Sequence, residues 1–175
     1  NTLNNCTASA TTVVDEDTTP PDADAGAPAT LNCTVTTLVL GDPNAPIGAN
    51  LSYNWTASNG GSIVSGGSTP TPTIDNPGTY NLVVSNAQNG CSSTASVVIN
   101  EDVIAPTAIV APGGQLNCTV PVLQLNGAGS STGPTFTYEW SSSSGGGIGA
   151  GGTTLTPTVT AAGTYTLTVT NSANG

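Results

Sequence analysis

The amino-acid sequence predicts an all-β protein built from two tandem β-sandwich repeats, and three observations lead to this prediction. A shift of 85 residues aligns the two halves of the 175-residue chain without a gap. Within each half, short stretches alternate between apolar and polar residues with a period of two, as half-buried strands do. Gly, Pro, Ser, Thr and Asn fill the intervals, and no long helix-period pattern occurs. Two copies of one strand-rich unit therefore make up most of the chain.

The first complete repeat divides into strands wherever the alternation is bounded by turn residues. The expected strands are residues 23–34, 36–41, 51–57, 69–74, 78–85 and 91–99. Gly26 and Pro28 would kink the first of them, which suits an edge strand. Residues 41–50 are expected to be a turn-rich loop, and residues 59–67 a Gly-rich excursion anchored by Ile63. The second repeat is expected to follow the same plan.

The repeat register also predicts the domain boundaries. We expect an orphan final strand of a preceding sandwich in residues 1–14, an acidic linker at 15–21, a complete domain at 22–100, a second linker at 101–105, and at 106–175 a domain that lacks its final strand. The hairpin that reaches Cys91 in the first repeat stops at Gly175 in the second, so the chain is expected to be a processed product or a window from something longer. The absent strand would come from the N-terminal strand of the next unit, a form of strand addition if the units are separate copies. One continuous polyprotein, with a peptide bond between Gly175 and the next Asn1, predicts the same contacts.

The order of strands and aromatic residues indicates an immunoglobulin-like sandwich. Counting the excursion at 59–67, it has about seven short strands, with a tryptophan on the third and a Gly-Thr-Tyr run opening the sixth. The residues that carry this pattern are Tyr53-Asn54-Trp55, Gly78-Thr79-Tyr80, Leu38 and Leu40, and their counterparts Tyr138-Glu139-Trp140, Gly163-Thr164-Tyr165, Leu123 and Leu125. The pattern resembles PKD-type (polycystic-kidney-disease-type) and related Ig-like repeats of giant bacterial surface proteins and adhesins. It departs from the PKD pattern because no Gly-Asp-Gly run follows the tryptophan, so neighbouring Ig-like families match equally well. The resemblance implies a stalk or adhesin role and assigns no catalytic residue.

Six aromatic residues on these strands are expected to form the cores of the two sandwiches. They are Tyr53, Trp55, Tyr80, Tyr138, Trp140 and Tyr165. Their alternation with polar neighbours favours burial over the lining of a ligand site. The hydroxyls of Tyr80 and Tyr165 would then bond to nearby backbone, as in a tyrosine corner.

The composition argues against several classes of partner and chemistry. The chain has no Lys, Arg or His and a net charge of −10, so nothing neutralises phosphates, and nucleic acid and anionic membranes are repelled. No apolar run approaches the roughly 20 residues of a membrane span. Without an imidazole base, an activating lysine or an oxyanion-binding cation, only a carboxylate pair or a metal could support catalysis, and we expect no enzyme. Four cysteines in such a chain suggest an oxidising, extracellular environment at the cell surface.

An acidic cluster lies at the junction that enters the complete domain. Its members are Asp15, Glu16, Asp17, Asp22 and Asp24, and Asp42 in a following loop is expected to face the same pole. Carboxylate oxygens at a domain junction are what Ca²⁺ prefers, so the cluster is a candidate calcium site that would stiffen a tandem array. A solvated acidic linker that keeps the protein soluble explains the same residues, and their spacing matches no metal motif. The second junction keeps Glu101 and Asp102 but has Thr107 and Ile109 at the later positions, so weaker binding or none is expected there.

The four cysteines admit several pairings, which the topology ranks. In such a sandwich the first strand ends at the pole where the chain leaves, near Cys33 and Cys118, whereas Cys91 begins the last strand at the opposite pole. A strand of about nine residues at ~3.3 Å each separates the poles by roughly 25 to 30 Å, far more than the roughly 4.4 to 6.8 Å between Cα atoms of a disulfide. We therefore expect staples between neighbouring domains, Cys33 with Cys6 of another copy and Cys118 with Cys91 of the next copy. Free thiols and a bridge within one domain are open alternatives.

Two functions of different classes fit these features. The first is structural, a repeat unit of an extracellular bacterial filament or adhesin stalk that joins head to tail with other copies or flanking repeats. The second is a binding module, in which loops at one pole, residues 41–50 or 126–134, recognise a glycan or another cell surface. Asp17-Thr18-Thr19 is similar to the O-glycosylation signal of some bacterial surface proteins, which makes Thr18 a candidate for modification.

Overall fold

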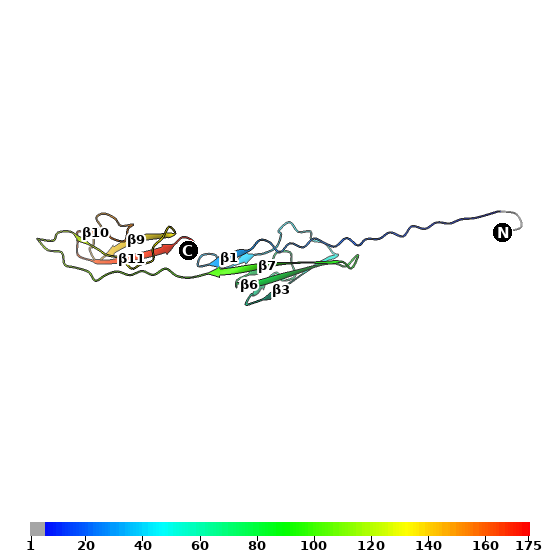
Figure 1. Cartoon of the computed structure of the whole chain (residues 1–175), viewed down its shortest axis with the longest axis horizontal. Helices are drawn as coiled ribbons and strands as arrows, with labels where there is room; N and C mark the ends of the chain where they lie inside the picture. The colour runs from blue at the N-terminus through cyan, green and yellow to red at the C-terminus, as the bar shows by residue number, and fades with distance from the viewer. Residues whose placement is uncertain (1–5) are drawn as a thin grey trace. The chain divides into compact units, whose positions relative to one another are not determined.

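The fold was established from a computed structural model, which describes residues 6–175. This part of the chain contains eleven β-strands and no helix. The strands of the first repeat are β1 (Ala29–Asn32), β2 (Leu38–Val39), β3 (Leu51–Ser58), β4 (Ile63–Ser65), β5 (Thr73–Ile74), β6 (Gly78–Asn86) and β7 (Ser92–Asp102) (Figure 1). Those of the second are β8 (Leu123–Gln124), β9 (Phe136–Ser143), β10 (Thr158–Val159) and β11 (Thr164–Asn171). The all-β class predicted from the sequence is confirmed.

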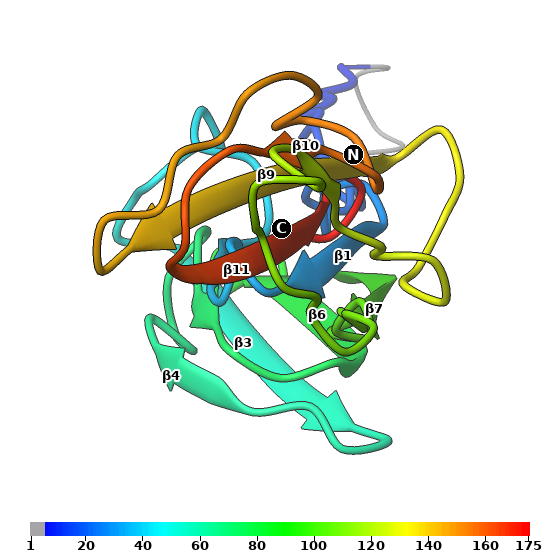
Figure 2. The same ribbon diagram turned by 90° about the vertical axis from the view of Figure 1, so that its left-hand side faces the viewer.

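Two sheets are built from the strands of the first repeat. One has the strand order β1-β7-β6-β3, and the other has the order β2-β5-β4. Strands β3 and β6 are antiparallel (Figure 2), and every second residue of each points into the core, as the period-two alternation requires. Strand β1 is parallel to the end of β7, where Leu31 lies opposite Glu101. The largest fully buried side chains include Tyr80, Ile74 and Leu82.

The strands of the second repeat begin at the same repeat positions or one residue from them. Strand β9 begins and ends 85 residues after β3, and β10 lies 85 residues after β5. Strand β11 is antiparallel to β9, and β10 is antiparallel to β8. A core of five buried residues holds these strands together, namely Leu125, Trp140, Val159, Leu167 and Val169.

The contacts of the chain divide it into two compact units whose limits differ from those of the sequence repeats. One unit comprises the residues up to Pro28 together with Val39–Val98, and the other comprises Ala29–Leu38 together with Ile99–Gly175. Strand β1 and the last four residues of β7 therefore belong to the second unit by their contacts, although they lie in the first sequence repeat. No helix of the described residues is long and apolar enough to cross a bilayer.

The N-terminal segment differs from the orphan strand expected in residues 1–14. Residues 6–28 contain no strand, and residues 1–5 lie outside the described part of the chain. A strand requires a neighbour that accepts and donates backbone hydrogen bonds, and within residues 6–175 no strand is paired with this segment. Val13 and Val14 are consequently 82% and 89% exposed.

Other strand boundaries also differ from the expected ones. The first two strands are shorter than expected. In the first, Gly26 adopts a left-handed conformation (φ 83°) that interrupts the expected strand 23–34. The excursion at 59–67 contains β4, which pairs with β5 through Ile63. The last strand continues past residue 99 to Asp102 and so enters the stretch expected to be a linker, because its pairing with β1 extends it there.

Candidate assembly site

Strand β11 has an open edge that its counterpart β6 does not have. In the described residues β11 pairs with β9 alone, whereas β6 lies between β3 and β7. Tyr80 on β6 is fully buried, but Tyr165 on β11 is only half-buried. The intervening residues follow the same trend, since Thr164, Thr166, Thr168 and Thr170 are exposed and Thr79, Asn81, Val83 and Ser85 are half-buried. An open strand edge carries backbone groups that can receive a further strand.

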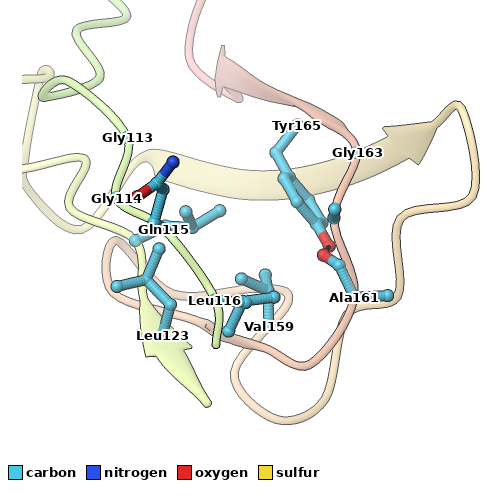
Figure 3. Close-up of a pocket in the computed structure, with 11 residues that line it drawn as sticks. Gly113, Gly114, Gln115, Leu116, Leu123, Val159, Ala161, Gly163 and Tyr165 are labelled. Atoms are coloured by element: carbon cyan, nitrogen blue, oxygen red, sulfur yellow. Dashed lines mark hydrogen bonds between the residues drawn. The ribbon is translucent and has the colours of Figure 1, made fainter. Parts of the chain in front are cut away.

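A groove of about 370 Å³ lies beside this edge, within the second unit (Figure 3). Residues 113–116 form one side of it, residues 161–163 and Tyr165 form another, and Leu123 and Val159 are among its apolar lining. In the first repeat the corresponding region is closed. Leu31, the counterpart of Leu116, is 2% exposed and lies on β1 beside β7, whereas Leu116 itself is half-buried. The groove is therefore lined by the repeat counterparts of β1 and of the start of β6, the two strands that flank β7 in the first repeat.

A buried asparagine ties the last turn of the chain to other segments of the second unit. Asn174 is 1% exposed, and its Nδ2 donates to Asp102 Oδ1 and to the carbonyl oxygen of Ile104, both at 3.0 Å. Its own carbonyl oxygen accepts the backbone N–H of Cys33 at 2.9 Å. We call these segments the joint, which consists of residues 32–35, 102–104 and 171–175.

The turn that carries Asn174 occurs also in the first repeat. Gly175 donates its N–H to the carbonyl oxygen of Asn171 at 2.8 Å, and Gly90 donates to that of Asn86 at the same distance. Both glycines lie in the left-handed region, with φ of 93° and 75°, where a side chain would be strained. The two turns therefore share one backbone plan.

Asn89 makes the side-chain contacts that correspond to those of Asn174. Its Nδ2 donates to the carbonyl oxygen of Thr19 at 2.9 Å. The backbone N–H of Thr19 and then the side chain of Asn89 lower the pKa of Asp17 below its ordinary value. Asp17 and Thr19 occupy the repeat positions of the two residues that the Asn174 side chain contacts, so each turn holds the segment that precedes its own repeat.

One buried atom of the joint has no hydrogen-bond partner in the described part of the chain, namely Asn174 Oδ1. The equivalent atom of the first repeat, Asn89 Oδ1, accepts the backbone N–H of Cys91 at 3.0 Å. A buried acceptor without a partner costs about 1–3 kcal/mol. The two turns therefore differ in whether this side-chain oxygen accepts a hydrogen bond within the described residues.

The loops that carry Cys33 and Cys118 have the same hydrogen bonds. Each loop begins with an asparagine whose Oδ1 accepts three hydrogen bonds from the residues two and three positions later. These sets are Asn32 with Thr34 and Val35, and Asn117 with Thr119 and Val120. The hydrogen bonds that shape the loop of Cys33, which binds Asn174, are therefore present in the loop of Cys118 as well.

Three of the cysteines carry free thiols in this structure, namely Cys33, Cys91 and Cys118. Cys33 and Cys118 are exposed, and Cys91 is half-buried. Cys6 is exposed and lies in the strandless N-terminal segment. The expected staples between neighbouring domains or copies stay a prediction, which the joint makes specific below.

The acidic residues of the candidate calcium site take part in local turns. Asp17, Asp24 and Asp42 each accept the backbone N–H two residues later, at distances of 3.2, 2.7 and 2.8 Å. The remaining members, Asp15, Glu16 and Asp22, are exposed. Within residues 6–175, no three His, Cys, Asp or Glu side chains are grouped so that they could hold a metal. The geometry favours the solvated linker, and calcium binding stays a prediction.

Two of these carboxylates act on a core tyrosine. Tyr53 is 8% exposed, and its hydroxyl donates to the carbonyl oxygen of Pro46 at 2.6 Å. Burial raises the pKa of Tyr53 above its ordinary value of 10.0, and the negative charges of Asp42 and Asp22 raise it further. The phenol is therefore held in its neutral, hydrogen-bonded form.

The aromatic residues expected in the cores are buried or half-buried and bond to backbone carbonyls. The hydroxyls of Tyr80 and Tyr165 donate to the carbonyl oxygen four residues upstream, at 2.6 and 2.5 Å. The indoles of Trp55 and Trp140 donate to the carbonyl oxygen fourteen residues downstream, at 3.0 and 2.8 Å. These bonds satisfy the polar atoms that the rings bring into the core. Only Tyr165 among them also lines the groove.

The other candidate residues lie on the surface. Thr18 is exposed in the strandless segment. The loop at residues 41–50 is largely exposed, with Ile47 at 82%, and the loop at 126–134 is mostly exposed.

Sequence reasoning missed the joint, which depends on polar residues in turns and at the end of β7. The available signal was the repetition of an asparagine at positions 89 and 174 together with an aspartate at positions 17 and 102. Identical polar residues at equivalent places in a turn and in a linker suggest that the two touch.

Comparison with known proteins identifies a similarity in the first repeat. The family model of the PKD-like domain matches residues 44–100. The PKD-type resemblance inferred from the sequence is thereby confirmed for this stretch. No curated protein matches the chain.

Three solved structures are similar to the chain at low identity. The solution structure of the PKD domain from human KIAA0319 shares 14% identity, covers 56% of this chain and 98% of its own, and has a TM-score of 0.36. Extracellular domains 3–5 of Drosophila OTK share 16% identity, with 87% of this chain and 57% of that chain covered and a TM-score of 0.38. The human desmocollin-1 ectodomain shares 13% identity, with 90% and 37% covered and a TM-score of 0.31.

Proposed function

We propose that the protein is a non-catalytic structural repeat unit of an extracellular bacterial fibre or adhesin stalk, in which copies join head to tail. In this assembly, residues 6–14 of one copy enter the groove beside β11 of another and complete its second sandwich. The observation that carries the proposal is the pair formed by the open groove and the buried acceptor Asn174 Oδ1. In the proposed assembly the incoming segment would take the place that β7 and the Cys91 amide have in the first repeat.

The repeat register assigns a place to each residue of the incoming segment. Cys6 corresponds to Cys91, so the N–H of an incoming Cys6 would reach Asn174 Oδ1 as the N–H of Cys91 reaches Asn89 Oδ1. Val14 corresponds to Ile99, which is 1% exposed in the core. It would therefore turn into the groove of the other copy.

Val13, next to Val14 in the incoming segment, provides a matched control for the burial of Val14. Val13 corresponds to Val98, which is 49% exposed, so its side chain would stay on the outer face of the completed sheet. Residues 15–17 correspond to Asn100–Asp102, which pair in parallel with Thr30–Asn32. The acidic linker would continue the new strand along residues 115–117.

The energetic reason for this assembly is the burial of apolar surface from the incoming segment and from the groove that receives it. Burying a Val side chain contributes about 1.5–3 kcal/mol, and Val14 is 89% exposed in the single chain. The open edge of β11 would gain backbone hydrogen bonds at the same time. An extracellular location follows the same proposal, because four cysteines in a chain without Lys or Arg suit an oxidising environment.

The test is sedimentation equilibrium of the full chain in reductant, over a wide range of concentration. We expect association into multiples of the chain mass, loss of association in Val14→Asp, and wild-type behaviour in Val13→Asp. A single-chain mass at every concentration would refute assembly between copies. Association that is unchanged by either substitution would refute the register that aligns Val14 with Ile99 and Val13 with Val98.

A second candidate function is an adhesive module that binds a glycan or another cell through its pole loops. In this alternative the loop at 41–50 would supply the recognition surface, and Ile47 is its most exposed large apolar side chain, at 82%. A glycan array compares the full chain with Ile47→Ser. Binding that Ile47→Ser abolishes would establish this role, and silence of both proteins would remove it.

A further inference from the structure

We infer that Cys118 of one copy and Cys91 of a second copy form an intermolecular disulfide across a joint of the same design as the one around Asn174. The inference rests on the proposed head-to-tail assembly and adds a covalent link to it. The backbone N–H of Cys118 would donate to the carbonyl oxygen of Asn89 in the second copy. The partner is therefore another molecule of this chain.

The chain already contains one complete example of the contact. The N–H of Cys33 donates to the carbonyl oxygen of Asn174 at 2.9 Å. Close packing accompanies this bond, because an added Cβ on Gly175 would lie 2.5 Å from Thr34 Cγ2. The cysteine at the end of a first strand thus bonds directly to the turn at residues 171–175. In the first repeat, the corresponding turn is followed by Cys91.

Each half of the contact recurs once more in the chain. The loop of Cys118 has the hydrogen bonds of the Cys33 loop, with Asn117 Oδ1 accepting the N–H groups of Thr119 and Val120 at 2.9 Å each. The turn of Asn89 has the plan of the Asn174 turn and ends on a left-handed glycine, Gly90. Both halves are therefore formed before they meet.

The turn half also has an open face. Nothing lies within 4 Å of a Cβ added at Gly90, although the corresponding position at Gly175 is packed against the loop of Cys33. The Cys118 loop is exposed as well, since Asn117, Cys118 and Thr119 are all exposed. In a head-to-tail array, the copy that donates residues 6–14 also presents its Asn89 turn to the Cys118 loop of the copy it completes.

The charge on the two surfaces permits this approach. Asp17 lies beside the turn, and its carboxylate is already bonded to Thr19 and Asn89. No carboxylate lies in the Cys118 loop at residues 117–120. The loop therefore brings no acidic side chain of its own to the carboxylate of Asp17.

The covalent step requires a two-electron oxidant, for which we name a small-molecule disulfide such as oxidised glutathione. The thiolate of Cys91 attacks one sulfur of the oxidant, so a mixed disulfide forms and one reduced thiol leaves. The thiolate of Cys118 then attacks the Cys91 sulfur, and the second reduced thiol leaves. Two protein thiols are oxidised, one disulfide is reduced to two thiols, and the two protons pass to the leaving thiolates.

The test uses the full-length Cys6→Ser/Cys33→Ser variant, in which only Cys91 and Cys118 remain. A mixture of isotopically light and heavy copies is oxidised with oxidised glutathione, separated without reductant and digested with chymotrypsin, because the chain has no site for trypsin. We expect a ladder of linked copies and a light–heavy peptide pair that joins Cys91 to Cys118. The control, Cys6→Ser/Cys33→Ser/Cys118→Ser, should form no ladder beyond a dimer.

The outcomes separate this inference from the proposed function. Only Cys91–Cys91 and Cys118–Cys118 links, or a Cys91–Cys118 bridge within one copy, would overturn the disulfide. Sedimentation of the same variant in reductant measures association through the strand contact alone, because no disulfide forms under these conditions. If reduced copies associate and the unlike link is absent, this inference fails alone, and if neither is observed, both fail.

Discussion

Replacing Asn174 with Ala should destabilise the protein far more than the same substitution at Asn89. Both asparagines occupy the same position of the repeat and both donate to the segment that precedes their repeat. Asn174 is 1% exposed, whereas Asn89 is half-buried and its bond to Thr19 lies at the surface. The comparison therefore isolates the effect of burial in the joint.

The magnitude follows from the bonds that are lost. Asn174→Ala removes a hydrogen bond to the Asp102 carboxylate, of about 1.5–3 kcal/mol, and one to the Ile104 carbonyl, of about 0.5–1.5 kcal/mol. It also removes the buried Oδ1 that has no partner, which offsets part of this loss. A net loss of about 2–3 kcal/mol is expected. Asn89→Ala loses two hydrogen bonds, to Thr19 and from the N–H of Cys91, but at this less buried turn water replaces them, and about 0.5–1 kcal/mol is expected.

Scanning calorimetry of both variants in reductant measures this difference. For a chain of this size, about 2–3 kcal/mol lowers the Tm by roughly 5–10 °C, and Asn89→Ala should lower it by roughly 1–3 °C. Hydrogen exchange adds a local readout, because the N–H of Cys33 loses its acceptor geometry when the joint loosens. Equal losses in the two variants, or a larger loss at Asn89, would refute the role assigned to the joint.

Three further predictions concern the strand contact, alkaline stability and calcium. Val14→Ala removes two buried carbons from the proposed contact, about 1.5 kcal/mol, so sedimentation should show association roughly tenfold weaker, while Val13→Ala is unchanged. Because the pKa of Tyr53 is raised in the folded protein, its contribution to stability is complete below pH 10.0 and is lost as the pH rises through the folded pKa. Urea titrations of a cysteine-free variant should therefore show a free energy of unfolding that falls with rising alkaline pH. Tyr53→Phe in the same background should remove this pH dependence. The solvated-linker interpretation of residues 15–24 predicts that millimolar Ca²⁺ leaves the Tm unchanged, and a rise that Asp22→Asn abolishes would instead establish the calcium site.

The central strands could be predicted from the sequence because their signal is strong and local. In β3 and β9 the large residues alternate with small polar ones, and Trp55 and Trp140 mark the inward face. Strand β4 was missed because it has only three residues, among glycines, which is too short a stretch to reveal an alternation with a period of two. The tail of β7 was missed because Glu101 and Asp102 are charged, and its extension depends on the distant pairing with β1.

The candidate site divides in the same way. The open edge of β11 could be predicted, since the register of the repeat leaves Gly163–Asn171 without the counterpart of β7. The joint could not, because the burial of Asn174 arises from the approach of residues 29–38 and 99–104, which no local pattern encodes. The carboxylates of residues 15–24 suggested a metal, and two of them, Asp17 and Asp24, bond to their own backbone. Calcium binding there stays a prediction.

Amide hydrogen exchange on β11, measured against protein concentration in reductant, tests the central claim most directly. If residues 6–14 of a second copy occupy the groove, the backbone amides of Thr164–Asn171 that face away from β9 should become protected as concentration rises. Val14→Asp should abolish this protection, and Val13→Asp should preserve it. Rapid exchange of these amides at every concentration, or protection that is independent of concentration and of Val14, would contradict assembly through this edge.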